Sequence, residues 1–535
     1  MAIKINNIIL KIDEDKSILK NKIAKKLKID ILEIKNFKII KESLDARKKN
    51  DIRFTYCIEI EHANEKKLVE RLKDRDVNLE EDSYDAEIEF GTKELKNRPV
   101  VVGFGPAGIF AALLLAEKGY KPLVIERGED VDKRTATVDK FWKDGKLNLE
   151  SNVQFGEGGA GAFSDGKLTT RIKDTRCDYI LRELVKAGAP EEITYVGKPH
   201  VGTDILKNVV KNIREKIKSL GGEIRFSSKL ENIKSEDGKI TSIVVNGEEI
   251  PCENVILGIG HSSRDTYEML NEIGVFMEPK AFAIGVRIEH PQDIINKSQY
   301  GETYKHPRLK AAEYRLTYQS KKLERAVYSF CMCPGGVVVA AASEENRLVS
   351  NGMSYHARDL DNANSALVVT VGPDDFEGDS PLRGMEFQRK YEGLAYSLGG
   401  GESKAPVQLV GDFMENRISE KLGGVNPSYK PGFEFKDLRE CLPSYVVEAL
   451  KEAIVEFDRK IKGYASSDAV LTGIETRTSA PVRLTRTETL ESISLIGLYP
   501  AGEGAGFAGG IISAAVDGLK VAERIIKEYK PITSI

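Results

Sequence analysis

The chain has few cysteines, six among 535 residues, and a single tryptophan. So few cysteines in so long a chain do not form a disulfide framework, which excludes the small disulfide-rich secreted class. No uninterrupted stretch is long and apolar enough for a membrane span, and the first residues lack the ordered segments of a signal peptide. We therefore predict a cytoplasmic protein with mostly reduced thiols and no membrane partner.

Neither sign of charge predominates, because 80 basic residues stand against 83 acidic ones for a net charge of −3. This balance gives no reason to expect nucleic acid as a partner. The sequence also lacks a Walker loop, an H-E-x-x-H motif, a Ser-His-Asp arrangement and a second cysteine pair with ligand spacing. We therefore predict no metal site, and a small molecule rather than a nucleic acid as the ligand.

A glycine-rich turn between two apolar segments is the most informative feature that is present. Residues 98–127 have the pattern strand, turn, helix, strand, and the turn carries Gly103, Gly105 and Gly108 in G-x-G-x-x-G spacing. These glycines permit a sharp turn, the approach of a pyrophosphate and close packing of helix on strand. Glu126 ends the second strand, where a carboxylate can bind a ribose hydroxyl. The segment predicts dinucleotide binding, against the alternative of a βαβ unit whose glycines serve packing alone.

The rest of the chain divides into three predicted domains of α/β class. Residues 1–97 show the order β-α-β-β-α-β, with a last strand at 84–90, which predicts a ferredoxin-like α+β domain. Residues 98–275 and 465–535 are predicted to form a discontinuous Rossmann-like domain with a parallel sheet. The stretch between them, 276–464, is predicted to be an inserted mixed α/β substrate domain.

Three separated signatures carry a family resemblance. They are VVGFGPAG…VIER near the start, VILGIGHSSRD in the middle and YPAGEGAGFAGGIISAAVDGLKVAE near the end. Their order resembles that of FAD-dependent oxidoreductases of the glutathione-reductase structural type. Nearly the whole chain is similar to a bacterial family of poorly characterised FAD-dependent dehydrogenases, described as NAD(FAD)-utilizing. The resemblance implies a Rossmann-like FAD fold and FAD as the cofactor, and it leaves the substrate open.

The resemblance also implies roles for individual residues. Those expected at the FAD pyrophosphate and the adenosine ribose are Gly103, Gly105, Pro106, Ala107, Gly108, Glu126 and Arg127. Those expected nearer the flavin are Gly258, Gly260, His261, Gly502, Glu503, Gly509, Gly510 and Ile511. Glu503 stands where such flavoproteins usually carry Asp, and this departure leaves its contact open. The helix that begins at Ile511 is expected to direct its N-terminal N–H groups at flavin N1 and O2.

A second glycine-rich segment, QFGEGGAGAFSDGKLTTR, covers residues 154–171. So many glycines are unfavourable in a core element without a specific cause. We interpret the segment as a loop that packs on the flat flavin, with an exposed flexible loop as the alternative. The residues expected to contact the cofactor are Gly158, Gly159, Ala160, Gly161, Ser164 and Asp165. Ser164, Asp165 and Lys167 are the candidates to reach flavin N5 or the substrate.

Cys331 and Cys333 lie in the strand-like segment YSFCMCPGG. Residues two apart on a strand point to the same side, so we expect both thiols on one face. A C-x-C disulfide is strained and easily reduced, which suits electron exchange with a flavin. Lining of the substrate site without redox change and plain packing are the alternatives.

A run of anion-binding side chains, TGIETRTSAPVRLTR, precedes the last FAD signature and contains Arg477, Arg483 and Arg486. We expect it to line the flavin face, with Arg477 acting on an anionic substrate, and structural ion pairs are the alternative. Among the histidines we select His261, because it ends the strand that carries Gly260. The candidate catalytic residues are thus Cys331, Cys333, Arg477 and His261.

These features together predict an FAD-dependent oxidoreductase, a dehydrogenase or reductase. It would move a hydride or an electron pair between flavin N5 and a small anionic organic substrate. No second G-x-G-x-x-G of comparable quality occurs, which disfavours a permanent NADPH domain. NAD(P)H, if used, would visit the substrate site as a transient donor. The alternative is a flavoprotein that acts on a protein thiol or an RNA recruited by the N-terminal domain, and a flavin sensor without enzymatic activity is the third possibility.

Overall fold

The computed structural model describes residues 2–79 and 88–532. The first of these segments contains β1 (Ile3–Lys11), α1 (Leu19–Leu27), β2 (Phe37–Asp45), β3 (Arg53–Ile60), α2 (Glu65–Leu72) and β4 (Val77–Leu79). The strands pair antiparallel in the order β2-β3-β1-β4. The last strand observed precedes the one expected at 84–90. Most of that expected strand lies outside the described residues, and 88–90 are not a strand.

A five-stranded parallel sheet forms the second part, in the order β23-β11-β5-β6-β7. Its strands are β5 (Val100–Val102), β6 (Leu123–Ile125), β7 (Glu223–Arg225), β11 (Val255–Leu257) and β23 (Leu498–Pro500). Alternate residues point to opposite faces. Val101 and Ile256 pack against the helices α3 (Pro106–Glu117), α6 (Thr203–Ser219) and α12 (Ile511–Glu528). Val100 and Leu257 pack with the opposite layer, which holds β8 (Leu230–Glu236), β9 (Lys239–Val245), β10 (Glu248–Pro251) and α7 (Arg264–Glu272).

A seven-stranded sheet forms the third part, in the order β14-β15-β18-β13-β21-β19-β20. Its strands are β13 (Phe282–Pro291), β14 (Thr317–Ser320), β15 (Arg325–Cys333), β18 (Asn362–Val371), β19 (Ala405–Leu409), β20 (Phe433–Phe435) and β21 (Val470–Glu475). The sheet therefore continues past residue 464, where we expected the insertion to end. The helix α11 (Ser444–Lys460) packs on its β13–β18 side, and α9 (Arg383–Leu398) contacts β19 and β21.

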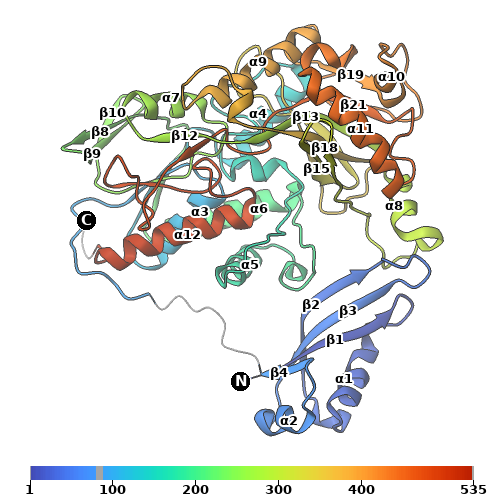
Figure 1. Ribbon diagram of the computed structural model, residues 1–535. Helices are drawn as coiled ribbons and strands as arrows, with labels where there is room; N and C mark the ends of the chain where they lie inside the picture. The colour runs from blue at the N-terminus through green and yellow to red at the C-terminus, as the bar shows by residue number, and fades with distance from the viewer. Residues whose placement is uncertain (1, 80–87, 533–535) are drawn as a thin grey trace.

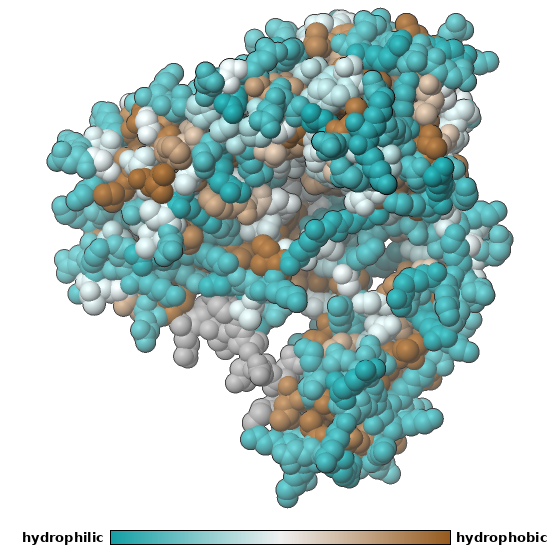
Figure 2. Space-filling model, in the orientation of Figure 1, coloured by the Kyte–Doolittle hydropathy of each residue, from teal (hydrophilic) through white to brown (hydrophobic). Residues whose placement is uncertain are grey.

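The described chain has further α-helices and strands. They are α4 (Val131–Asp144), α5 (Arg176–Lys186), α8 (Gln292–Tyr300), α10 (Val410–Glu415), β12 (Met277–Pro279), β16 (Gly336–Ala340), β17 (Ser350–Ser354) and β22 (Val482–Leu484). Within the described residues, no helix combines the length and apolar character that crossing a membrane requires. Hydrophilic residues predominate on the face drawn in Figure 2, where hydrophobic residues occur in small separate groups.

The N-terminal sheet lies below the two larger parts in Figure 1 and contacts them through two segments. Glu42 of β2 exchanges backbone hydrogen bonds with Tyr195 and Gly197, each at 2.7 Å. The Arg308 guanidinium donates to the carbonyl oxygens of Ile12 at 2.9 Å and Glu14 at 2.6 Å. The N-terminal domain is therefore attached by backbone pairing on one side and by a partly buried cation contact on the other.

Candidate functional site

A cavity of about 390 Å³ opens at the carboxyl ends of the parallel strands β5, β6, β11 and β23. This edge is where open parallel sheets bind their ligands. The far wall of the cavity comes from the seven-stranded sheet, through the ends of β15 and β21. The cavity thus has a side formed by the G-x-G-x-x-G turn and an opposite side formed by the inserted sheet.

Helix α3 begins at the edge of this cavity. Gly105, Pro106 and Ala107 line it, and Gly105 caps the helix without a side-chain hydrogen bond. The N–H groups of the first turn are therefore free to bind an anion. A Cβ on Gly105 would lie 3.6 Å from Cα of Gly159, so two glycine loops approach closely here. This cradle fits a pyrophosphate.

Helix α12 begins on the same cavity. Gly509, Gly510 and Ile511 line it, and Gly510 also provides no side-chain cap. Two helix N-termini therefore direct their partial positive charge into one space. The combination fits FAD, which has an anionic pyrophosphate and a flavin that gains negative charge on reduction.

Glu126 joins the first glycine turn to the second. Its Oε2 accepts from the Phe104 N–H at 2.7 Å, and its Oε1 accepts from the N–H groups of Gly128 and Gly156, each at 2.9 Å. An ionised carboxylate has about four acceptor positions, so about one remains for a ribose hydroxyl. Glu126 therefore organises the loops of the site as well as lining it.

Arg127 forms part of the wall next to Glu126. Its guanidinium pairs with Asp265 at 2.9 Å and with Glu150 at 2.6 Å. It also lies over the ring of Phe155, 4.1 Å from the centroid. These contacts hold the side chain flat, so it contributes a surface to the cavity rather than a mobile charge.

Most residues expected at the cofactor line this cavity. Those that do so are Gly103, Gly105, Pro106, Ala107, Glu126, Arg127, Gly159, Ala160, Gly161, Ser164, Asp165, Gly258, Gly260, His261, Glu503, Gly509, Gly510 and Ile511. Gly108, Gly158 and Gly502 do not. A Cβ on Gly108 would lie 1.9 Å from the Gly103 oxygen, and Gly158 and Gly502 have φ of +87° and +74°. These three glycines permit close packing and turns, and their expected contact with the cofactor stays a prediction.

His261 and Glu503 lie together at the cavity, with 4.0 Å between Nε2 and Oε1. Burial and the charges of Arg477 and Arg264 lower the pKa of His261 to about 3. Burial raises the pKa of Glu503 to about 7. Between these two residues, Glu503 is therefore the one that titrates near neutral pH, whereas His261 is a neutral ring whose Nδ1 lies 3.0 Å from the Ser262 hydroxyl.

Arg477 lines the cavity, but its guanidinium is already bound. It donates to Glu392 at 3.1 and 3.2 Å and to the Ser343 hydroxyl at 2.5 Å. Arg486 is likewise paired, with Asp517 at 2.6 Å. Both arginines form ion pairs, as the structural alternative expects, and the action of Arg477 on the substrate stays a prediction.

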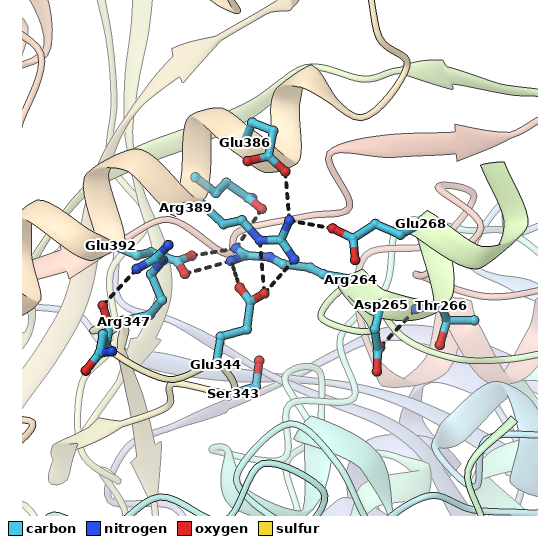
Figure 3. A network of polar contacts seen from close by, with 12 residues as sticks. Arg264, Asp265, Thr266, Glu268, Ser343, Glu344, Arg347, Glu386, Arg389 and Glu392 are labelled. Atoms are coloured by element: carbon cyan, nitrogen blue, oxygen red, sulfur yellow. Dashed lines mark hydrogen bonds and ion pairs between the residues drawn. The ribbon is translucent and has the colours of Figure 1, made fainter. Parts of the chain in front are cut away.

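The partner of Arg477 belongs to the network drawn in Figure 3. Glu392 of α9 is fully buried and also binds Arg264 of α7, with 2.6 Å between Nη2 and Oε1. Glu344 bridges Arg264 to Arg389 of α9, and Arg389 reaches Glu268 of α7 at 2.6 Å. The two arginines beside Glu392 lower the pKa of its carboxyl. This network fixes the inserted domain to the parallel-sheet domain beside the cavity.

Glu475 is a cavity residue that the sequence analysis missed. It ends β21, and its carboxylate pairs with Arg287 of β13, 3.0 Å from Nη1. Burial raises the pKa of Glu475 to about 7 although Arg287 opposes the shift. Glu475 is an acid at the end of the apolar strand VLTGIE, and Glu126 was predicted as a site residue on the same pattern. The sequence therefore contained a signal for Glu475.

Asp165 and Lys167 connect the second glycine loop to the inserted sheet. Asp165 pairs with Lys167 at 2.9 Å and with Arg358, whose Nε lies 2.9 Å away. The Lys167 ammonium also contacts the Met332 carbonyl oxygen. The loop over 154–171 is therefore built into the cavity wall, and the alternative of an exposed flexible loop is not what the structure has.

The two cysteines differ in position. Cys331 lines the cavity, whereas Cys333 is fully buried and does not. The pairing of β15 with β18 shifts its register between Phe330 and Cys333, and Cys331 has φ of +44°. The strand is therefore irregular at this point, so regular strand alternation does not set the positions of the two thiols.

Two family models match the chain. One is described as "FAD-dependent protein, C-terminal domain-like" and covers residues 281–478. The other, "Domain of unknown function (DUF8436)", covers residues 2–61. The first spans the seven-stranded sheet from β13 to β21, and the second spans β1 to β3.

Several proteins are similar in sequence. An uncharacterized protein of Clostridium beijerinckii is 70% identical over 529 residues, which is 99% of both chains. Protein FixC of Escherichia coli is 25% identical over 205 residues, 37% of this chain and 44% of FixC. The chain thus matches less than half of FixC. The solved L-proline dehydrogenase from P. horikoshii is 13% identical, covering 82% of this chain and 94% of that one, with a TM-score of 0.33.

Proposed function

We propose that this chain is an FAD-dependent oxidoreductase that transfers a hydride or an electron pair between bound flavin and a small anionic organic molecule. The observation that carries the proposal is the composition of this cavity. A cofactor cradle with two helix N-termini lines the cavity together with two carboxyl groups whose pKa is raised to about 7, Glu503 in the loop before α12 and Glu475 at the end of β21.

The chain's own residues would hold the cofactor at defined places. The first turn of α3 would bind the pyrophosphate, and Glu126 would accept from the ribose through its remaining acceptor position. The first turn of α12 would stabilise negative charge on the reduced ring. When bound, FAD supplies the redox chemistry.

Glu503 is the candidate to hold or release a proton during the reaction. Its pKa of about 7 leaves both protonation states populated at neutral pH, which is the condition for efficient general acid–base catalysis. Glu475 has a similar pKa but is held by Arg287, so a proton there would weaken a buried ion pair. Glu503 therefore carries the proton role in this proposal.

The position of Lys167 supports the proposal that the substrate is an anion. Its ammonium group lines the cavity beside Cys331, and its side chain retains 25% exposure although Asp165 pairs with it. Arg127 and Arg477 also line the cavity, but their guanidinium groups are bound by acids of the wall. Lys229 also lines the cavity, with 33% exposure, but pairs with Asp265. Lys167 is the lining cation that lies beside Cys331, and we propose it as the group that binds a carboxylate or phosphate there.

Anaerobic titration of the FAD-loaded protein tests the proposal. NADH, NADPH and small anionic donors are added in turn, and the visible flavin band is followed. We expect one of them to bleach the band, and bleaching by a nicotinamide would make it the transient donor. In Glu503→Gln the rate of reduction should fall about 100-fold, whereas the exposed Glu420→Gln should match the wild type. Reduction by dithionite alone would count against the proposed substrate class.

A further inference from the structure

The end of strand β15 carries a bulge at the wall of the cavity. Phe330 pairs with Ala366 of β18, but Cys333 pairs with Asn364, so β15 has one residue more than its partner over this stretch. Cys331 takes the extra space in a left-handed conformation, with φ of +44°. Residues other than glycine seldom adopt this backbone conformation. Bulges next to functional sites commonly redirect a side chain.

Two cations hold the bulge in place. Arg287 Nη2 donates to the Cys331 carbonyl oxygen at 2.6 Å, and the Lys167 ammonium contacts the Met332 carbonyl oxygen. Arg287 is fully buried and is itself fixed by Glu475 and by Asn364, with 2.9 Å between Nε and Oδ1. A strained backbone persists where its surroundings over-determine it, and such sites are commonly functional.

The bulge directs Cys331 into the cavity and leaves Cys333 behind it. Hydrogen bonding between the two sulfurs, with the positive charges of Lys167 and Arg287, lowers the pKa of Cys331 to about 6. The same contact and burial raise the pKa of Cys333. The pair thus has a cysteine of lowered pKa that faces the cavity and a buried cysteine of raised pKa in contact with it. This is the arrangement of an attacking and a resolving cysteine.

Other buried cysteines of the chain differ from this pair. Burial raises the pKa of Cys252 and of Cys441 to about 12, as expected for thiols that only fill space. No group of three or more metal-ligating side chains occurs among the described residues, so the pair has no partners for a metal site there. Packing alone does not account for a strained bulge that two cations support.

We infer that Cys331 and Cys333 form a dithiol–disulfide centre that exchanges an electron pair with the flavin, an inference that rests on the proposed function. In the oxidising direction, an S–S bond forms between the two sulfurs and the S–H bond of Cys333 breaks. The electron pair and that proton pass to the oxidised flavin. Reduction of the disulfide runs the same step in reverse, so the site would store two electrons in addition to those of the flavin.

Reductive titration of the full-length, FAD-loaded protein tests this centre. The protein is oxidised with ferricyanide, desalted and titrated anaerobically with dithionite. We expect the wild type to take up four electrons per flavin, because each two-electron couple contributes two. Cys331→Ala and Cys333→Ala should each take up two. Cys177→Ser, which removes a partly exposed cysteine elsewhere, is the matched control and should still take up four.

A mass-spectrometric assay gives a second result that needs neither activity nor a variant. Trypsin should release residues 326–347 as one peptide that contains Cys331 and Cys333 and no other cysteine. In the oxidised protein this peptide should resist iodoacetamide until it is reduced, and then gain two labels. Two labels before reduction, together with uptake of only two electrons, would overturn the inference and leave the proposed function intact. A protein that takes up no FAD would overturn the proposed function instead.

Discussion

Arg287 and Glu475 form an ion pair at the wall of the cavity, with 3.0 Å between Nη1 and Oε1. Both side chains are buried, with exposures of 0% and 3%. Arg287 also donates to the carbonyl oxygen of Cys331. One buried cation therefore connects β13, β21 and the bulge of β15, so the stability of the sheet and the position of Cys331 depend on the same pair.

Removal of the acid from this pair should be strongly destabilising. In Glu475→Ala the Arg287 charge stays buried with its main counter-charge gone, and we expect a loss of about 3–5 kcal/mol in the free energy of unfolding. Urea unfolding at pH 8, where the carboxyl is ionised, measures it. The control is Glu434→Ala, which removes an exposed partner of Lys404 and should change the free energy by less than about 1 kcal/mol. Equal unfolding midpoints for both variants would contradict the expected contribution of the buried ion pair to stability.

The cofactor side of the site was open to prediction because its signals are local in sequence. The turn at Gly103 to Gly108 follows from the packing needs of a strand, a helix and a phosphate within one βαβ unit. The start of α12 at Ile511 follows in the same way from glycines that cannot continue a strand. Neither inference needs to know which distant residues pack against the segment.

The catalytic side of the site was harder to predict from the sequence because its residues contact partners that are distant in sequence. The pattern around Arg477 does not indicate that Glu392, on a separate helix, takes its guanidinium. The bulge at Cys331 depends on a register shift against β18 and on Arg287 of β13, which the alternation of a regular strand does not indicate. In the N-terminal domain, β4 has only three residues, too few for a periodic pattern.

Gly105→Ala should separate cofactor binding from folding. The added Cβ would meet Cα of Gly159 at 3.6 Å, an ordinary contact, so the protein should fold. The methyl group would nevertheless occupy the cradle at the start of α3. We expect the dissociation constant for FAD to rise about tenfold or more, or ~1.4 kcal/mol, by fluorescence titration.

The control for that substitution is Gly372→Ala, where φ is −134° and the nearest atom to the new Cβ is 4.0 Å away. This variant should bind FAD like the wild type. If Gly105→Ala binds FAD with unchanged affinity and has a normal unfolding midpoint, the pyrophosphate does not bind at the start of α3.

The pH dependence of stability should report Glu503. Its pKa of about 7 in the folded protein lies above the ordinary 4.5, so folding takes up a proton between these values. The contribution of Glu503 to stability is fully present below pH 4.5 and is lost as the pH rises through 7. Glu503→Gln removes the buried charge, so at pH 8 it should be more stable than the wild type by about 1–3 kcal/mol, allowing for partial solvent screening.

Thermal unfolding of the FAD-free protein at several pH values measures this difference without the linkage that a bound ligand adds. The advantage of Glu503→Gln should shrink toward zero at pH 5, because the wild-type carboxyl is then neutral in the folded state. Glu420→Gln, at an exposed position, should follow the wild type throughout. A constant difference in stability between Glu503→Gln and the wild type from pH 5 to pH 8 would rule out a raised pKa for Glu503.

Arg308→Ala should loosen the N-terminal domain and leave the cofactor site unchanged. The guanidinium binds the carbonyl oxygens of Ile12 and Glu14 and lies 4.2 Å from the ring centroid of Phe54. Hydrogen bonds to a charged group contribute about 1.5–3 kcal/mol each, so we expect amide exchange in β1 and β3 to accelerate about 30-fold or more. Lys310→Ala, which removes an exposed partner of Glu192, should leave exchange unchanged. If exchange accelerates while FAD affinity stays constant, the domain is held by its own contacts and can be varied independently of the flavin. If FAD affinity falls as well, the N-terminal domain is part of what keeps the cavity closed, and its role in the site is structural.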